Sequence, residues 1–171
     1  MHTALVFAAA LLLQHANAQP FSGLVTFGDS YTDARIPAAD GGIAWPIYAA
    51  SYANASLYPF AKSGATCSNN ITYRPSPPVF ESQLPAYFDL VENGTLVLDA
   101  NETLYSLWIG TNDVGAKALL DGSSVGNLDQ VTACMVNWVK VMYEAGVKNF
   151  LFQNVRELCL DSFIFLIQSR N

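Results

Sequence analysis

The sequence predicts an α/β domain, a three-layer α/β/α sandwich built around a parallel sheet. Two features of the 171 residues indicate this class. Short apolar, partly β-branched runs end at Gly or Asn, as buried strands do, and segments between them have the spacing of helices. Strands that alternate with helices pair in parallel, with helices on both faces of the sheet. No internal repeat interrupts the pattern, and the length fits one domain.

Four runs are predicted to be strands of this sheet. They are Leu24–Phe27, Leu57–Ala61, Leu104–Ile109 and Phe150–Phe152. The first run ends at Gly28 and the third at Gly110, where the lack of a side chain permits a tight turn. The fourth run is bounded by Asn149 and Asn154.

The clearest predicted helix runs from about Asp129 to Ala145, and Gly146 then supplies its C-terminal stop. Its apolar residues recur at the spacing of one buried helix face: Val131, Met135, Trp138, Val139 and Met142. A shorter helix is predicted at Trp45–Tyr52, with Pro46 in its first turn. The stretch Thr72–Phe80 contains three prolines and is predicted to be a loop, because proline cannot pair centrally in a sheet.

Residues 1–18 are predicted to be a cleaved signal peptide, which makes the protein secreted and extracellular. The apolar run Ala4–Leu13 is followed by Ala16-Asn17-Ala18, the small-x-small pattern of a cleavage site. This run is shorter than the roughly 20 residues needed to span a hydrocarbon core. The alternative, an N-terminal core helix, is disfavoured by the polar and small residues just before Gln19, where the mature chain is expected to begin.

Sequons and charge agree with secretion. Four Asn-x-Ser/Thr sequons, at Asn54, Asn70, Asn93 and Asn101, are predicted glycosylation sites on surface loops. The net charge is −6 and the eight Lys and Arg residues are scattered. Because phosphate contacts require clustered basic side chains, neither a nucleic-acid partner nor an anionic membrane partner is expected.

The three cysteines, Cys67, Cys134 and Cys159, leave one thiol unpaired in an oxidising compartment. A disulfide between Cys67 and Cys134 is favoured, and it would contribute about 4 kcal/mol on the chain-entropy model. The alternative is that both are small buried hydrophobic residues. Cys-x-x-Cys and His-containing metal spacings are absent from the sequence, so no zinc or other metal is expected.

Polar clusters follow three of the predicted strands. They are Phe27–Asp33, which contains Ser30, then Ser63–Ala65, and Gly110–Asp113. Active sites of open α/β sheets lie at the carboxyl ends of the strands, so these clusters are expected to meet at one edge of the sheet.

These clusters resemble the sequence blocks of the GDSL/SGNH hydrolase family, which has a flavodoxin-like fold. Gly28-Asp29-Ser30 looks like the first block, Gly64 like the glycine of the second, and Gly110-Thr111-Asn112-Asp113 like the third. The resemblance implies that Ser30 is the nucleophile and that its backbone N–H stabilises an oxyanion. It implies two further oxyanion-hole donors, the N–H of Gly64 and the side chain of Asn112. One position departs from the family: Tyr31 replaces a leucine at a packing position.

Within the family, Gly64–Asn69 and Trp108–Asp113 look most like fungal secreted acetylesterases, carbohydrate esterase family sixteen. The resemblance implies hydrolysis of small acyl esters, chiefly acetyl esters on carbohydrate, through an acyl-serine intermediate and without a cofactor. It extends over roughly Gly23 to Val155. Residues 19–155 are therefore interpreted as a partial hydrolase domain.

The family's Asp-x-x-His block, which supplies the general base, has no counterpart here. The only histidines are His2 and His15, both in the predicted signal peptide. The chain is therefore predicted to be truncated and inactive, with the atypical tail 156–171 attributed to a truncated or mis-spliced gene model, although a genuine terminal strand is an alternative. Lys62 is a second, weaker candidate for the base. An alternative function is a non-catalytic secreted carbohydrate-binding protein.

Other interpretations remain open for single residues. Ser30 could be a helix N-cap, and Asn112 could cap a helix that begins near Asp113. Asp29 and Asp33 are interpreted as a turn-capping pair rather than a magnesium site. Trp45, Tyr48 and Trp108 could line a sugar-binding cleft, although aromatic residues on strands and helices are more often core. Of these, Trp108 is interpreted as a core residue and Trp45 is left undecided.

Overall fold

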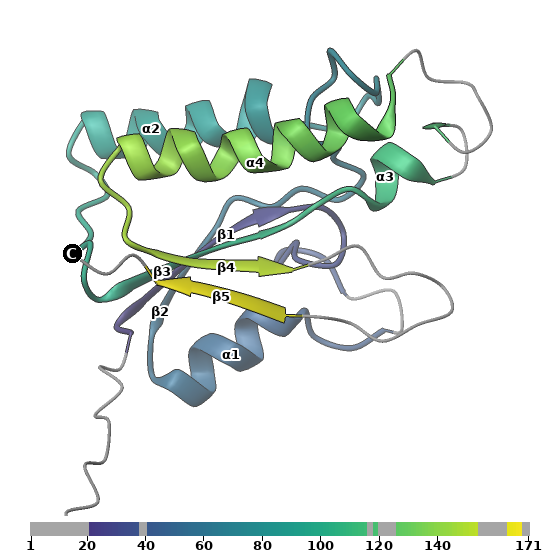
Figure 1. The fold of residues 1–171 in the computed structure, drawn as a ribbon. Coiled ribbons are helices and arrows are strands. Elements are labelled where there is room, and N and C mark those ends of the chain that lie inside the picture. The colour runs from purple at the N-terminus through teal and green to yellow at the C-terminus, as the bar shows by residue number, and fades with distance from the viewer. Residues whose placement is uncertain (1–20, 38–40, 116–117, 120–125, 154–163, 169–171) are drawn as a thin grey trace, which may run out of the picture.

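The computed structural model describes residues 21–37, 41–115, 118–119, 126–153 and the backbone of 164–168. Its strands form one sheet in the order β2-β1-β3-β4-β5 (Figure 1). The strands are β1 (Gly23–Gly28), β2 (Ser56–Pro59), β3 (Thr103–Trp108), β4 (Asn149–Gln153) and β5 (Ile164–Gln168). The helices are α1 (Trp45–Ala53), η1 (Val79–Gln83), α2 (Leu84–Glu92), α3 (Thr111–Val114) and α4 (Leu128–Glu144).

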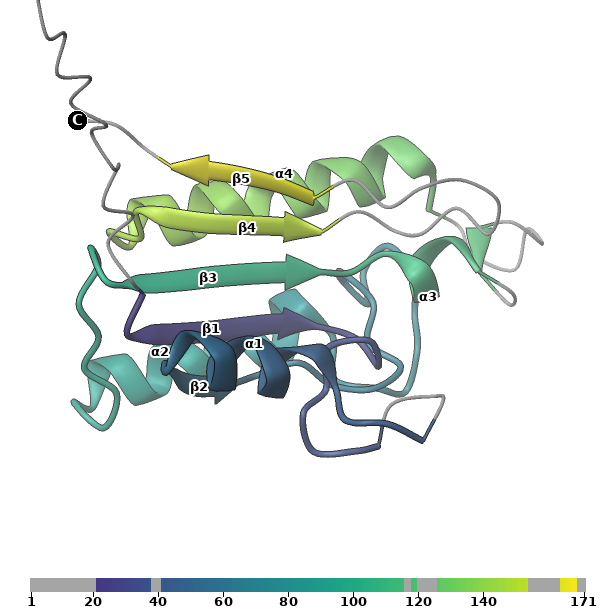
Figure 2. The same ribbon diagram turned by 90° about the horizontal axis from the view of Figure 1, so that it is seen from below.

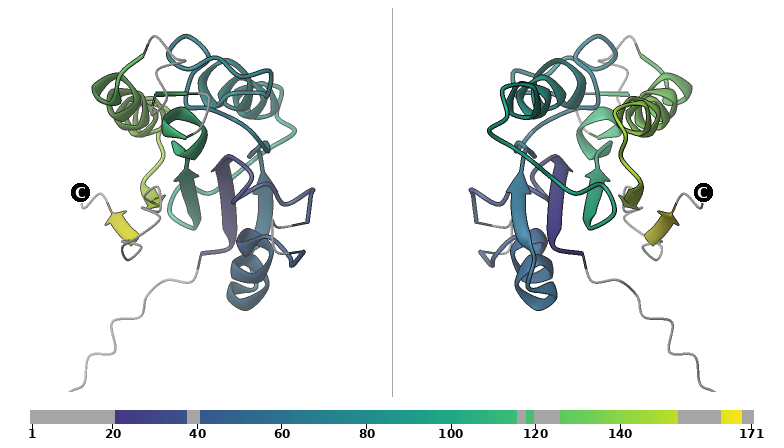
Figure 3. Two further views of the ribbon diagram at one scale, coloured as in Figure 1. Left: turned by 90° about the vertical axis from the view of Figure 1, so that its right-hand side faces the viewer. Right: turned by 90° about the vertical axis from the view of Figure 1, so that its left-hand side faces the viewer.

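Helices flank the sheet on both faces. Figure 3 shows α2 and α4 over one face and α1 under the other. Strands β1 to β4 pair in parallel, with β1 between β2 and β3. The predicted α/β fold with a parallel sheet and flanking helices is therefore confirmed for these four strands.

Strand β5 departs from the prediction of an all-parallel sheet, because it pairs antiparallel with β4, with Leu151 opposite Leu166. Parallel neighbours need a crossover of about a dozen residues or more, usually containing a helix. The sequence between these two strands, residues 154–163, is shorter than that. The apolar run in the tail thus forms a strand, which is the alternative that the sequence left open.

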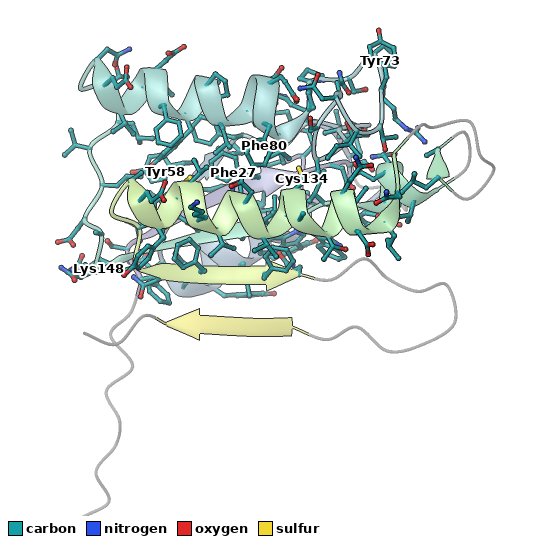
Figure 4. The ribbon with its side chains drawn as sticks, turned by 45° about the horizontal axis from the view of Figure 1, so that its top comes forward. Phe27, Tyr58, Tyr73, Phe80, Cys134 and Lys148 are labelled. Atoms are coloured by element: carbon teal, nitrogen blue, oxygen red, sulfur yellow. A yellow bond between two sulfur atoms is a disulfide. The ribbon has the colours of Figure 1, made fainter. Side chains whose placement is uncertain are left out.

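An aromatic cluster joins the sheet to the helices α2 and α4. Phe27, on β1, packs against Phe60, Tyr87 and Trp138, with ring centroids 5.4, 5.7 and 5.6 Å away. Tyr87 belongs to α2 and Trp138 to α4, so both helices are anchored on the same strand. Figure 4 shows this layer with Phe27 at its centre and Cys134 beside it. The strand that leads to Ser30 is therefore buried along its whole length and packed against both helices.

Helix α4 agrees with its prediction to within one residue at each end. It begins with a capping box, in which the Asn127 side chain accepts the N–H of Gln130 and the Gln130 side chain accepts that of Asn127. Its buried residues are Val131, Cys134, Trp138 and Met142.

The pair η1 and α2 was missed, and Val79 and Phe80 belong to η1 rather than to the predicted loop. The prolines are the reason for the error. Pro78 is the N-cap residue of η1, and Pro85 lies in the first turn of α2, where proline is tolerated.

A disulfide joins Cys67 to Cys134, the pair that the sequence favours. It links the chain just after the polar cluster Ser63–Ala65 to helix α4. Cys159, the predicted signal peptide and most of the tail lie outside the described residues.

The four sequon asparagines are all exposed: Asn54, Asn70, Asn93 and Asn101. None of the helices described combines the length and hydropathy that a membrane span requires.

Candidate active site

Three polar segments, residues 27–33, 63–69 and 110–113, contain the three polar clusters and lie at the carboxyl edge of the sheet, next to its topological switch point. The chain adds β2 on one side of β1 and then returns to add β3 on the other. Figure 2 shows β1, β3 and β4 ending on the same side, where α3 follows β3. In doubly wound sheets this is the position at which ligands bind.

The turn after β1 is hydrogen-bonded to the segments that follow both neighbouring strands. The backbone N–H of Asp29 donates to the carbonyl oxygen of Trp108, at the end of β3, at 3.3 Å. On the other side, the N–H of Lys62 donates to the carbonyl oxygen of Gly28 at 3.0 Å. The first polar segment is therefore hydrogen-bonded to the residues that lead into each of the other two segments.

The second and third polar segments are also joined directly. The carboxamide nitrogen of Asn112 donates to the carbonyl oxygen of Ala65 at 2.9 Å. Both carboxylate oxygens of Asp113 accept the backbone N–H of Cys67 at 3.1 Å. Segments that lie far apart in the sequence are thus brought together at one edge of the sheet.

Ser30 is exposed and lies in a tight turn immediately after β1. The turn is closed by Asp29: its carbonyl oxygen accepts the N–H groups of Thr32 and Asp33, both at 3.0 Å, and its side chain accepts the N–H of Tyr31 at 3.1 Å. No described helix begins at Ser30, so the structure does not support the N-cap interpretation. The exposed hydroxyl stands at the end of a buried strand, the position that a nucleophile requires.

Two glycines are required by close contacts in this region. A Cβ atom on Gly28, whose φ is +145°, would lie 2.2 Å from the carbonyl oxygen of Trp108. A Cβ atom on Gly64, whose φ is +79°, would lie 2.4 Å from Oγ of Ser76. Only glycine fits either position without local rearrangement.

Asn112 does not cap a helix, so that interpretation is wrong. Gly110 is the N-cap residue of α3, and Asn112 lies inside the helix. One hydrogen of its carboxamide is used by Ala65. Because a carboxamide nitrogen carries two hydrogens, the other can donate to a bound oxygen atom.

Asp29 and Asp113 are both fully buried, at 0% exposure. Burial raises the pKa of Asp29 from 3.8 to about 7; the Tyr31 N–H opposes this rise and the Asp113 charge adds to it. Burial also raises the pKa of Asp113 to about 6, against the effect of the Cys67 N–H. Oδ2 of Asp29 has no hydrogen-bond partner among the described residues. Both carboxyl groups are therefore held close to protonation at neutral pH.

Asp33 closes a turn, as its interpretation as a capping residue requires. Its carboxylate accepts the N–H groups of Ser63, at 2.9 Å, and Arg35, at 3.1 Å. Within the described ranges no group of three or more potential metal ligands lies close together.

Burial, together with the Arg35 charge, lowers the pKa of Lys62, the alternative candidate for the base. That role for Lys62 stays a prediction.

The aromatic residues near the turn are less buried than a core interpretation requires. Trp108 is only half-buried, and Tyr31, which is 43% exposed, stacks on it with ring centroids 5.1 Å apart. Tyr31 therefore packs against Trp108, as expected at a packing position, but it remains partly exposed to solvent. Trp45 is half-buried and donates its indole N–H to Thr32 Oγ1 at 3.2 Å, and Tyr48 is exposed.

Sequence reasoning missed two residues of η1 that bind the polar segments. The Gln83 carboxamide binds the backbone of Gly28, and the Glu81 carboxylate accepts the Ser68 hydroxyl and the Asn69 N–H. A single Gln or Glu beside a proline-rich stretch has no spacing pattern that would distinguish it. No sequence signal was available for either residue.

Comparisons with known proteins agree with this geometry. The model of the GDSL-like lipase/acylhydrolase family matches residues 24–166. The chain is 31% identical to an acetylesterase of Hypocrea jecorina in an alignment that covers 82% of this chain and 49% of that protein. It is 27% identical to an acetylesterase of Thermothelomyces thermophilus in an alignment that covers 77% of this chain and 52% of that protein.

The expected similarity to fungal acetylesterases is thus confirmed as a distant one, and the chain spans about half the length of the curated relatives it matches. The family match extends over most of the sequence and includes all three polar segments at the sheet edge. The chain belongs to the GDSL-like lipase/acylhydrolase family, a family of carboxylic ester hydrolases.

Proposed function

We propose that this chain is the nucleophile-bearing part of a secreted esterase that removes acetyl groups from carbohydrate. The observation that carries the proposal is the hydrogen-bonded convergence of the three polar segments at the switch point of the sheet. The names of the relatives support an acetyl substrate. The predicted signal peptide and four exposed sequons support secretion.

In the proposed reaction, the Ser30 hydroxyl attacks the acyl carbon and the carbonyl oxygen gains the negative charge. The N–H groups of Ser30 and Gly64 and the carboxamide of Asn112 donate to that oxygen, each worth about 3 to 4 kcal/mol in the transition state. The sugar alcohol then leaves with a proton, and water hydrolyses the acyl-serine to release acetate.

A serine hydroxyl needs a base to accept its proton. None of the described residues is a histidine, and the two histidines of the sequence are His2 and His15. We therefore propose that an Asp-x-x-His segment outside these 171 residues supplies the base, which fits relatives about twice as long.

The test compares Ser30→Ala in this chain and in a protein extended through any downstream Asp-x-x-His, with an aryl acetate as substrate. When nucleophile and base act as a unit, losing either one costs about 10⁶-fold in rate, nearly as much as losing both. We expect Ser30→Ala to abolish turnover in the extended protein and to change little in the short chain, because we expect the short chain to be nearly inactive. Brisk, Ser30-dependent hydrolysis by the short chain would show that another residue, with Lys62 the first candidate, is the base.

A second candidate function is carbohydrate binding without catalysis. It is favoured by the exposed Tyr31 ring, which stacks on Trp108 beside the proposed nucleophile, since sugar rings bind to such aromatic faces. A sugar affinity that Tyr31→Ala removes, together with an extended protein that has no esterase activity, would select this function over the esterase.

A further inference from the structure

The end of β1 extends beyond β2 and needs another partner for its backbone. Strand β2 pairs with β1 only as far as Thr26 opposite Pro59, whereas β3 continues to Gly28 opposite Trp108. On the β2 side, the carbonyl oxygen of Gly28 accepts the N–H of Lys62 at 3.0 Å, but the N–H of Gly28 lies beyond the last residue pair with β2. Buried backbone donors and acceptors are almost always paired, because an unpaired one is costly.

The side chain of Gln83 supplies the partner for this N–H and a second donor for the carbonyl oxygen. Its Oε1 accepts the N–H of Gly28 at 3.0 Å, and its Nε2 donates to the carbonyl oxygen of Gly28 at 2.8 Å. Nε2 also reaches the carbonyl oxygen of Pro77 at 3.3 Å, and the residue is 1% exposed. A carboxamide presents an acceptor oxygen and a donor nitrogen in one plane, as a peptide group does, and so continues the ladder by one step.

The π-helical turn η1 places Gln83 there. The N–H of Gln83 bonds the carbonyl of Pro78, and the N–H of Leu84 bonds that of Val79, both five residues back. Such turns are rare and occur frequently at functional sites. The buried residues of the turn are Val79 and Gln83, and the N–H of Val79 donates to Thr66 in the second polar segment at 3.0 Å. One turn thus contacts both segments that supply the proposed backbone donors.

We infer that Gln83 is a positioning residue for the nucleophile. It fixes the peptide two residues before Ser30 and thereby sets the direction of the Ser30 hydroxyl and N–H. It touches no substrate and acts only through Gly28. Its catalytic consequence rests on the proposed esterase function, because a shift of about 1 Å in a reacting group can cost about 100-fold in rate.

The kinetic test uses Gln83→Met in the extended protein described above, because methionine keeps the length of the side chain and removes both hydrogen bonds to Gly28. We expect kcat to fall about 10- to 100-fold while KM stays within about twofold. The matched control is Val79→Ala, on the same turn and fully buried, which removes packing but no bond to Gly28. It should lower the melting temperature and leave kcat within about twofold. Equal kcat losses in both variants would reduce Gln83 to a structural residue and overturn the inference.

A conservative variant, Gln83→Glu, adds a pH signature. A protonated carboxyl group can reproduce both bonds to Gly28, whereas a carboxylate cannot donate. The ratio of its kcat to that of the wild type should rise as pH falls, and taking the ratio cancels the titration of the shared base. A ratio that does not change with pH in the folded variant contradicts the inference.

Amide hydrogen exchange in the 171-residue chain separates this inference from the proposed function. Gln83→Met should accelerate exchange at Gly28 and through the turn to Thr32 at least tenfold more than Val79→Ala does. Acceleration spread evenly over the sheet in both variants would overturn the positioning role. If the extended protein hydrolyses no ester, the proposed function fails, and this exchange difference alone decides whether Gln83 orders the turn.

Discussion

At the scale of single residues, the carboxyl groups of Asp29 and Asp113 are the least expected feature of the site. Each lies next to a proposed catalytic residue, Ser30 or Asn112, and each is fully buried. Burial penalises the charged form, so each carboxyl group binds its proton more tightly in the folded protein than in the unfolded chain.

This difference makes the stability of the fold pH-dependent. Between about pH 4 and pH 7 the folded state retains a proton on Asp29 that the unfolded state releases, so the free energy of unfolding falls as pH rises through that window. Asp29→Asn removes the charge and keeps an acceptor for the Tyr31 N–H. We expect it to be more stable than the wild type at pH 8, by roughly 2 to 4 kcal/mol.

Urea denaturation from pH 4 to pH 8 checks this prediction. Asp99→Asn is the matched control, because Asp99 is exposed and its carboxylate accepts the N–H of Asn101 in the same kind of turn, at 2.7 Å. The wild type and Asp99→Asn should share one pH slope, and Asp29→Asn should show a shallower one. Three equal slopes would mean that Asp29 titrates as an ordinary aspartate.

Two glycines give a graded prediction. In Gly28→Ala the new Cβ would meet a backbone oxygen, and in Gly64→Ala it would meet the movable Ser76 hydroxyl. Gly94 also has a positive φ, +73°, but nothing lies within 4 Å of its Cβ position, so Gly94→Ala measures backbone strain alone, about 1 to 2 kcal/mol. We expect the loss of stability in urea to rank Gly28→Ala above Gly64→Ala above Gly94→Ala. A Gly28→Ala protein as stable as Gly94→Ala would exclude the close contact with Trp108.

At the scale of elements, the parts that the sequence predicts well are those with a repeating pattern. Helix α4 has several apolar residues on one face, and β1 is a continuous apolar run before a glycine. The elements η1 and α2 were not predicted, because Pro78 and Pro85 are typical of loops as well as of helix starts. Because η1 was not predicted, the position of Gln83 could not be predicted either. Its role also depends on the pairing of β1 with β2, which ends at Thr26 opposite Pro59.

The disulfide links two elements and carries its own prediction. Cys67→Ala/Cys134→Ala should lower the free energy of unfolding by about 4 kcal/mol, because the bond closes a loop with a sequence separation of 67. Asn127→Ala, which removes the cap of the same helix α4, should cost only about 1 kcal/mol. Non-reducing peptide mapping of secreted protein should yield one cross-linked peptide with Cys67 and Cys134, and Cys159 should react with an alkylating reagent. Recovery of Cys67 and Cys134 as free thiols would contradict the pairing.

At the scale of the whole molecule, the site follows from topology more than from any single motif. The rule that open α/β sheets carry their active sites at the carboxyl ends of the strands predicts that the three polar segments meet at one edge. The prediction of an all-parallel sheet is wrong at β5, where a short connection leads to antiparallel pairing. The contacts that finish the site, such as Asn112 to Ala65 and Asp113 to Cys67, depend on loop conformations that no periodicity encodes.

The central place of β1 in the sheet also has a consequence for biosynthesis. The ribosome makes this strand first, yet its two neighbours are complete only when Trp108 has been added. Until then the apolar run Leu24–Phe27 has a partner on one side at most, because β2 is complete at Pro59 and β3 is not. Strands with an unpaired edge are prone to aggregate during slow, non-local folding. The stretch of synthesis between Pro59 and Trp108 therefore leaves the central strand of the sheet open along one edge.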